Sequence, residues 1–258
     1  MKHLLPRFIR RGLRFLASYP SIGRRMASLF GLFEVTLLET MWTLGRRTRL
    51  DYFGDLMPLF LRVYGSRVIP LDRSLDAVPT ISPTEEILSI VRRVPNLALS
   101  YCYCRARHKN CNNDLWTCIQ VGSGRSLEEL ASAVPTKSAT LAEVEDVIMR
   151  SHEAGLVHQL ITAPTRDFFY VICNCCACCC VTLRSAITYG YKNTALASNF
   201  IAVQDRELCD ACGVCVKRCH FGARQIMDNR LAFDSDRCVG CGLCVTKCPQ
   251  SAISMTRR

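Results

Sequence analysis

The sequence predicts an α+β protein built from three consecutive regions, and three observations lead to this prediction. Basic and apolar residues concentrate near the N-terminus, helix start signals alternate with apolar runs in the middle, and duplicated cysteine motifs occupy the C-terminal end. We expect a helical docking region over 1–80, a cysteine-rich α+β domain over 81–198 and a pseudo-twofold domain over 199–258. With 49% hydrophobic and 21% charged residues, the chain can bury a core, which excludes a disordered protein.

The 18 cysteines of this 258-residue chain are far more than an ordinary protein contains. Such enrichment indicates either a disulfide framework or thiolate ligands for metal. Disulfide frameworks are typical of short secreted chains that lack a hydrophobic core, whereas this chain is long enough to have one. We therefore interpret the cysteines as metal ligands in a reducing, cytoplasmic setting.

The first 50 residues carry ten basic and two acidic side chains, which account for most of the formal net charge of +11. On a helical wheel, the arginines of residues 4–16 share one side and apolar side chains fill the other. Such a helix can lie on anionic lipid, dock to a partner or pack on its own protein. We expect peripheral contact with the inner face of a membrane, or with a partner, through residues 1–45.

The apolar stretch 26–45 is about as long as a membrane span. It contains Glu34 and Glu39, whose burial at bilayer depth would be costly, so we predict a buried or interfacial helix. The pair Arg10-Arg11 resembles a twin-arginine export signal, but Arg24-Arg25 follow where a cleavable signal stays uncharged. These features favour a cytoplasmic protein.

Helix signals are clearest in the middle of the chain, where three capping boxes occur between residues 82 and 143. The last of them, at Thr140, predicts a helix that ends at Gly155. Two apolar runs, 156–161 and 168–172, follow as predicted strands. This order is similar to that of a winged-helix domain. The predicted helix is acidic, however, so we do not expect a nucleic-acid partner.

Ten cysteines lie in the central domain, in two groups that each follow an apolar run. Alternate residues of a strand point to the same face, so a Cys-x-Cys pair at a strand end presents both sulfurs together. Such thiolates suit an iron–sulfur cluster, or zinc as an alternative. Within 176–180 we expect some cysteines to pack as small apolar side chains without binding metal, because consecutive residues of a helix cannot all face one metal centre. The candidate ligands are Cys102, Cys104, Cys111, Cys118, Cys173 and Cys175.

The C-terminal region contains an internal duplication of one cysteine motif. Shifting the first half by 29 residues places its four cysteines on those of the second half, and also places Asp205 on Asp234 and Gly213 on Gly242. Three closely spaced cysteines let a tight loop wrap three corners of an iron–sulfur cube, and the glycines relieve backbone crowding. The eight cysteines are Cys209, Cys212, Cys215, Cys219, Cys238, Cys241, Cys244 and Cys248.

This duplicated motif resembles the bacterial-type ferredoxin domain, which binds two [4Fe-4S] clusters, over residues 199–258. In that family the fourth cysteine of each half binds the cluster of the other half. His220 departs from the family pattern, in which proline follows this cysteine, and we expect it to pack rather than to bind iron. The resemblance implies one cluster on Cys209, Cys212, Cys215 and Cys248 and another on Cys238, Cys241, Cys244 and Cys219.

The resemblance also implies transfer of single electrons between redox partner proteins, such as a flavoprotein or a membrane redox complex. The sequence contains neither a Gly-x-Gly-x-x-Gly loop nor a phosphate-binding loop, so we expect a partner to supply flavin or nicotinamide chemistry. The central cysteines make a third iron–sulfur cluster a further expectation. Two alternatives stay open: an oxidoreductase whose central cluster reduces a substrate, and a redox-sensing regulator built on the winged-helix-like segment.

Overall fold

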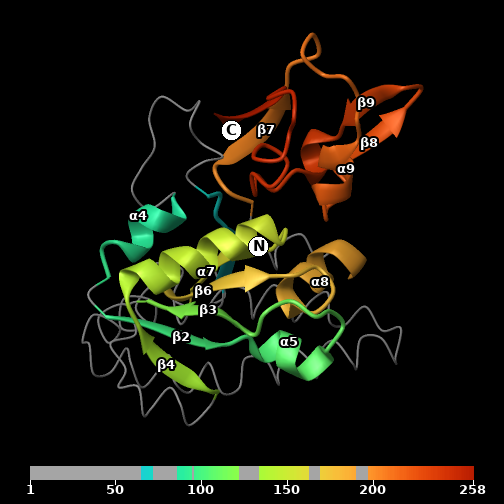
Figure 1. Ribbon diagram of the computed structural model, residues 1–258. Coiled ribbons are helices and arrows are strands. Elements are labelled where there is room, and N and C mark those ends of the chain that lie inside the picture. The colour runs from blue at the N-terminus through green and yellow to red at the C-terminus, as the bar shows by residue number, and fades with distance from the viewer. Residues whose placement is uncertain (1–64, 72–85, 95, 122–133, 163–168, 190–196) are drawn as a thin grey trace, which may run out of the picture.

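Figure 1 shows the computed structural model of the chain. Helices and strands occur together throughout the described residues, which confirms the α+β class. Residues 1–45 and the capping boxes at Ser82 and Ser126 lie outside the described residues. Within the described ranges, no helix is both long and apolar enough to cross a lipid bilayer. The structure describes residues 65–71, 86–94, 96–121, 134–162, 169–189 and 197–258.

The central domain is organised around a six-stranded antiparallel sheet with the strand order β1-β5-β6-β3-β2-β4. The two runs predicted as strands after Gly155 are neighbours within this sheet. The edge strand β1 comes from the segment assigned to the docking region, and it pairs with β5. The strands are β1 (Gly65–Val68), β2 (Leu97–Tyr101), β3 (Trp116–Gln120), β4 (Thr136–Ala139), β5 (Val157–Thr162) and β6 (Phe169–Cys175).

Helix α7 (Leu141–Glu153) packs on one face of this sheet (Figure 1). Its start has the predicted capping box, because the hydroxyl of Thr140 accepts from the amide of Glu143 while the Glu143 carboxylate accepts from the amide of Thr140 at 2.8 Å. After the helix, Gly155 adopts a left-handed φ of 81° and turns the chain toward β5. The shorter helices described in this domain are α4 (Ile87–Val91), α5 (Tyr103–His108) and α8 (Val181–Tyr189).

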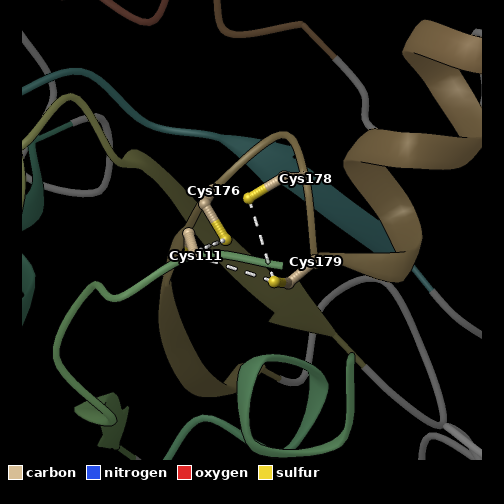
Figure 2. Close-up of side chains that lie close together, drawn as sticks. All are labelled: Cys111, Cys176, Cys178 and Cys179. Carbon is tan, nitrogen blue, oxygen red and sulfur yellow. Dashed lines mark hydrogen bonds between the residues drawn. The ribbon is translucent and has the colours of Figure 1, made fainter. Parts of the chain in front are cut away.

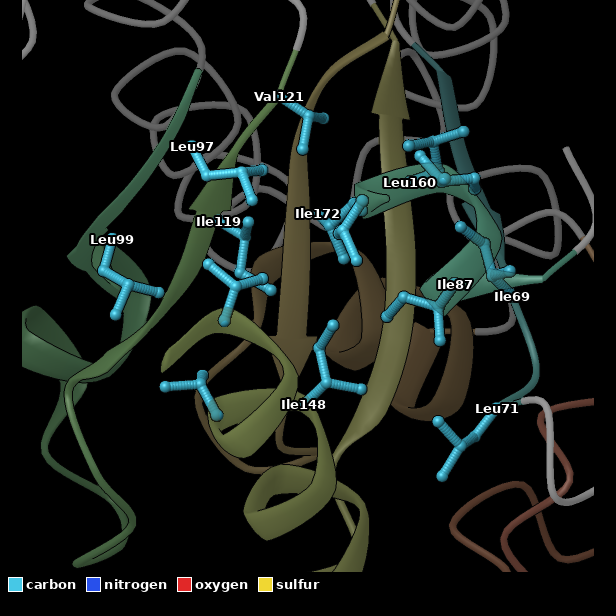
Figure 3. Packing of buried hydrophobic residues seen from close by; sticks show 14 residues of the cluster. Ile69, Leu71, Ile87, Leu97, Leu99, Ile119, Val121, Ile148, Leu160 and Ile172 are labelled. Atoms are coloured by element: carbon cyan, nitrogen blue, oxygen red, sulfur yellow. The ribbon is translucent and has the colours of Figure 1, made fainter. Parts of the chain in front are cut away.

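The main hydrophobic core lies between α7 and the sheet (Figure 3). It includes Ile148 of α7, Ile119 of β3 and Ile172 of β6, none of which has any exposed surface. Ile119 and Ile172 are cross-strand partners, and so are their neighbours Cys118 and Cys173. Because successive strand residues point to opposite faces, the two thiols lie on the face away from α7. The sheet therefore separates the apolar core from these thiols.

The C-terminal domain repeats one local structure in the two halves of the duplicated motif. Asp205 and Asp234, which are equivalent in the duplication, each accept a hydrogen bond from the amide two residues later, at 2.9 and 3.0 Å. Gly213 and Gly242 both adopt a left-handed backbone, with φ of 76° and 75°. Strand β7 pairs with β10, and β8 pairs with β9. The elements are β7 (Phe200–Gln204), α9 (Val214–Arg218), β8 (Arg224–Met227), β9 (Arg230–Phe233), the 3-10 helix η3 (Ser235–Arg237) and β10 (Ile253–Arg257).

The C-terminal domain contacts the end of α7. Arg218 donates hydrogen bonds to the carbonyl oxygens of His152 at 2.7 Å and Glu153 at 2.9 Å. These carbonyls lie at the C-terminal end of the helix, where the helix dipole favours a cation. The Nε2 atom of His220 lies 2.8 Å from the carbonyl oxygen of Gly155. The residue that departs from the ferredoxin pattern therefore contacts the chain directly after α7.

Candidate metal centres

The first candidate centre is a cavity in the C-terminal domain that cysteines from both halves of the duplication line. Cys209, Cys212 and Cys215 come from the first half, and Cys248 comes from the second. The space free of protein atoms here, including the part open to solvent, is about 300 Å³. Cys212 is exposed, so this cavity lies close to the protein surface.

The second candidate centre has the complementary set of cysteines. Cys238, Cys241 and Cys244 line it together with Cys219 from the first half. The space free of protein atoms here, including the part open to solvent, is about 340 Å³. Burial raises the pKa of Cys241, and it raises the pKa of Cys244 to about 11. These thiols must therefore lose their protons when they bind a metal. The structure brings the eight C-terminal candidates together in two sets of four, each containing one cysteine from the other half.

Arg224, the first residue of β8, is a buried cation close to both sets. Only 2% of the surface of Arg224 is exposed. Its Nη2 donates a hydrogen bond to the carbonyl oxygen of Ala202 at 3.0 Å, whereas its Nη1 has no hydrogen-bond partner among the described protein atoms. Burial raises the pKa of Cys215 and of Cys244, and the charge of Arg224 opposes both effects. Arg224 was not among the residues expected from the sequence. A signal was present, because the equivalent position of the second half is the buried, apolar Ile253.

A third candidate centre lies in the central domain, where four sulfur atoms all lie within 4.8 Å of one another (Figure 2). Cys111 comes from the loop after α5, and Cys176, Cys178 and Cys179 come from the turn between β6 and α8. The Sγ of Cys111 lies 3.7 Å from that of Cys176 and 3.9 Å from that of Cys179, which in turn lies 3.8 Å from that of Cys178. Four thiolates gathered in this way can bind a soft or borderline metal.

Cys111 was among the candidates named from the sequence, and the other central candidates lie outside this four-sulfur cluster. The Sγ atoms of Cys118 and Cys173 lie 4.0 Å apart on adjacent strands. The thiol of Cys102 interacts with that of Cys118, and the thiol of Cys175 interacts with that of Cys173. Cys104 lies on α5. Apart from Cys104, the candidates therefore divide between the four-sulfur cluster and a second, largely buried thiol group. This buried thiol group contains Cys102, Cys118, Cys173 and Cys175.

The ligands named from the sequence did not include Cys176, Cys178 and Cys179. A helix was expected there, and consecutive residues of a helix cannot all face one metal centre. The structure has a turn at these positions, and the helix begins only at Val181. In the turn, the sulfurs of neighbouring residues point into the same space. The interval from Cys176 to Cys179 is the Cys-x-x-Cys spacing of many metal sites, and this was the available sequence signal.

Arg105 of α5 is a second buried cation, with 1% of its surface exposed. It donates hydrogen bonds to the hydroxyl of Thr117 at 2.9 Å and to backbone carbonyls, including that of Asn174 at 3.0 Å. These partners are all neutral. Burial lowers the pKa of Arg105, and the neighbouring sulfurs of Cys102, Cys175 and Cys176, once deprotonated, together raise it by more. A buried cation with neutral partners requires nearby negative charge, which metal-bound thiolates would supply.

A buried chain of polar side chains connects the C-terminal domain with the central sheet. The Oγ1 of Thr246 lies 2.7 Å from Nε2 of His152 on α7. The Nδ1 of His152 lies 3.2 Å from Nε2 of His158 on β5, whose Nδ1 lies 2.5 Å from Oδ1 of Asn174 on β6. Asn174 separates two cysteines of the buried thiol group, so this chain joins the second half of the C-terminal motif to the central thiols.

We expect acid to destabilise the protein through His158. Burial lowers the pKa of His158 to about 4, and the hydrogen bond with Asn174 opposes this effect only in part. Between pH about 6.5 and about 4 the unfolded state binds a proton that the native state does not, so the free energy of unfolding falls by about 1.4 kcal/mol per pH unit, ~3 kcal/mol in all. Anaerobic denaturant unfolding across this range measures the effect. His158→Gln should show a weaker pH dependence than the natural protein, and equal pH dependence would contradict the assignment.

Comparison with known families agrees with this geometry. Residues 231–254 match the family model of the 4Fe-4S binding domain. The match contains Cys238, Cys241, Cys244 and Cys248. This match is consistent with a ferredoxin-type domain at the C-terminal end, and it supports the binding of at least one [4Fe-4S] cluster there. No curated protein matches the chain.

Proposed function

We propose that this protein relays single electrons between redox partners through two [4Fe-4S] clusters in its C-terminal domain. The main support is that eight cysteines line two cavities in exchanged sets of four. When bound, such clusters supply one-electron chemistry without rearrangement of bonds. The chain itself would bind the iron through thiolates. Arg224 would place positive charge beside both clusters.

The two cavities have different surroundings, which supports an outer and an inner cluster. At the outer cavity Cys212 is exposed, and the nearby Leu208 is 54% exposed, so a partner can approach here. The inner cavity is lined by Leu243, which is 1% exposed and packs in one cluster with Cys175 and Cys180 of the central domain. An electron exchanged at the surface near Cys212 would therefore reach the inner cluster next to the central domain.

The proposal includes two further parts. Residues 1–45 would dock the protein to a redox complex or a membrane face, through the basic and apolar side chains of that segment. The four-sulfur cluster of Cys111, Cys176, Cys178 and Cys179 supports an additional metal centre in the central domain.

Iron and sulfide analysis of the full chain, purified without oxygen, tests the two-cluster relay. We expect about eight irons and about eight sulfides per chain in the C-terminal clusters, with broad absorbance near 400 nm that dithionite bleaches. Electron paramagnetic resonance of the reduced protein should show two interacting paramagnetic clusters. Zinc in place of iron at these cysteines, or cystine bonds between them, would reject the proposal.

A further inference from the structure

We propose that Cys111, Cys176, Cys178 and Cys179 bind a single tetrahedral metal ion, zinc or ferrous iron, and not a third iron–sulfur cluster. This inference deepens the additional centre of the proposed function. It offers a single ion as the alternative to the expected third cluster, and it holds whether or not the C-terminal clusters carry electrons between partners.

The distances between the sulfur atoms favour a single ion. With metal–sulfur bonds of about 2.3 Å, the thiolates at the corners of a tetrahedron lie about 3.8 Å apart. The three sulfur–sulfur contacts in the cluster measure 3.7, 3.8 and 3.9 Å. In Figure 2 the four side chains point toward one another from the loop after α5 and the turn before α8. One ion at the centre could bind all four with little movement of the backbone.

The C-terminal cysteines provide a comparison within the same molecule. In a [4Fe-4S] cluster each thiolate binds a different iron, so the four sulfurs surround the cluster and do not contact one another. The C-terminal sets line two cavities instead. Among the described residues, the central cluster is the one set of metal-binding side chains with its ligand atoms all within 4.8 Å. The same chain therefore contains both arrangements.

The surroundings of the cluster also suit a charged metal–thiolate centre. Four thiolates and a divalent ion carry a net charge of minus two, and the buried guanidinium of Arg105, which acts on Cys176, offsets part of it. The amide of Asn113 donates to the Sγ of Cys111 at 3.4 Å, and the amide of Asn110 donates to the carbonyl of Cys178 at 2.8 Å. Hydrogen bonds of this kind orient the ligands of metal sites.

A site with four protein ligands has no open position for a substrate. Structural zinc sites have this closed form, whereas catalytic sites keep a position for water or substrate. The proposed ion would hold the loop that contains Cys111 to the turn that follows β6. It would then stabilise the central domain and would not reduce a substrate.

Metal analysis of the anaerobically purified full chain tests this proposal. We expect one zinc per chain beside the clusters, or one iron in excess of sulfide. The double variant Cys111→Ser/Cys179→Ser should lose this one ion and keep all of its sulfide. Cys104→Ser is the matched control, because Cys104 lies on α5 outside the cluster, and it should keep the ion.

X-ray absorption at the zinc edge of the natural protein gives a second test that does not depend on the folding of a variant. If zinc is bound, we expect about four sulfur neighbours at about 2.3 Å and no metal–metal scattering. Loss of both iron and sulfide from the double variant would show a third cluster and overturn the proposal. Equal metal content in the variant and the natural protein would show that these thiols only pack. An absence of the two C-terminal clusters would reject the relay but not this site.

Discussion

Replacing Cys219 with serine is expected to remove the cluster bound by Cys238, Cys241 and Cys244, although Cys219 belongs to the other half of the duplication. The cavity lined by those three cysteines contains Cys219, while Cys248 lines the other cavity. The Cys219→Ser variant should therefore lose about four of about eight irons and the same share of sulfide, and keep the outer cluster. Iron and sulfide counts, with spectra of the reduced protein, measure this result.

Double variants separate exchanged ligands from unexchanged ones. If the sets are exchanged, Cys219→Ser/Cys238→Ser affects a single cluster, whereas Cys219→Ser/Cys209→Ser affects both. If each half binds its own cluster, Cys219→Ser/Cys238→Ser affects both clusters, whereas Cys219→Ser/Cys209→Ser affects only one. Cys104→Ser, made at a cysteine on α5, should leave the C-terminal iron unchanged. The comparison uses variants with the same number of lost thiols, so a general loss of stability cannot imitate the pattern.

Local features of the fold could be predicted from the sequence where the signal itself was local. The capping box at Thr140 and the glycine at 155 define helix α7 and its end. The 29-residue duplication predicted equivalent turns, and the equivalent hydrogen bonds of Asp205 and Asp234 agree with it. In each case, residues close in sequence determine the geometry.

The central site could not be predicted in the same way, because its geometry depends on tertiary contacts. Cys111 lies more than 60 residues before Cys176, and the sheet and α5 bring them together. The local structure after β6, turn or helix, determines which thiols can bind the same ion. The eight-residue run with six cysteines has no strong propensity for either structure. Buried cations such as Arg105 look like ordinary surface residues in a sequence, because their burial is a property of the whole fold.

Replacing Arg224 with methionine is expected to lower the reduction potentials of both C-terminal clusters. Reduction adds negative charge to a cluster, and a buried cation close to Cys215 and Cys244 stabilises that charge. A loss of stabilisation equal to a tenfold change in the reduction equilibrium lowers the potential by about 59 mV for one electron. We expect shifts of this order, measured by redox titration of the anaerobic protein. Methionine keeps most of the length of the side chain, and Ile253 shows that the equivalent position of the other half is apolar and buried.

Two further variants distinguish the charge of Arg224 from its packing. Arg224→Lys keeps the positive charge but loses the planar guanidinium that lies 4.6 Å from the ring of Phe233, so its potentials should stay closer to those of the natural protein. Arg230→Met removes one positive charge from an exposed position of β9, where solvent screens it, and should change the potentials little. Equal shifts in Arg224→Met and Arg230→Met would show that only net charge matters. A cation close to both sets of thiolates must change the reduction potentials of both clusters. If Arg224→Met changed the reduction potential of only one cluster, Arg224 would lie beside that cluster and not between the two.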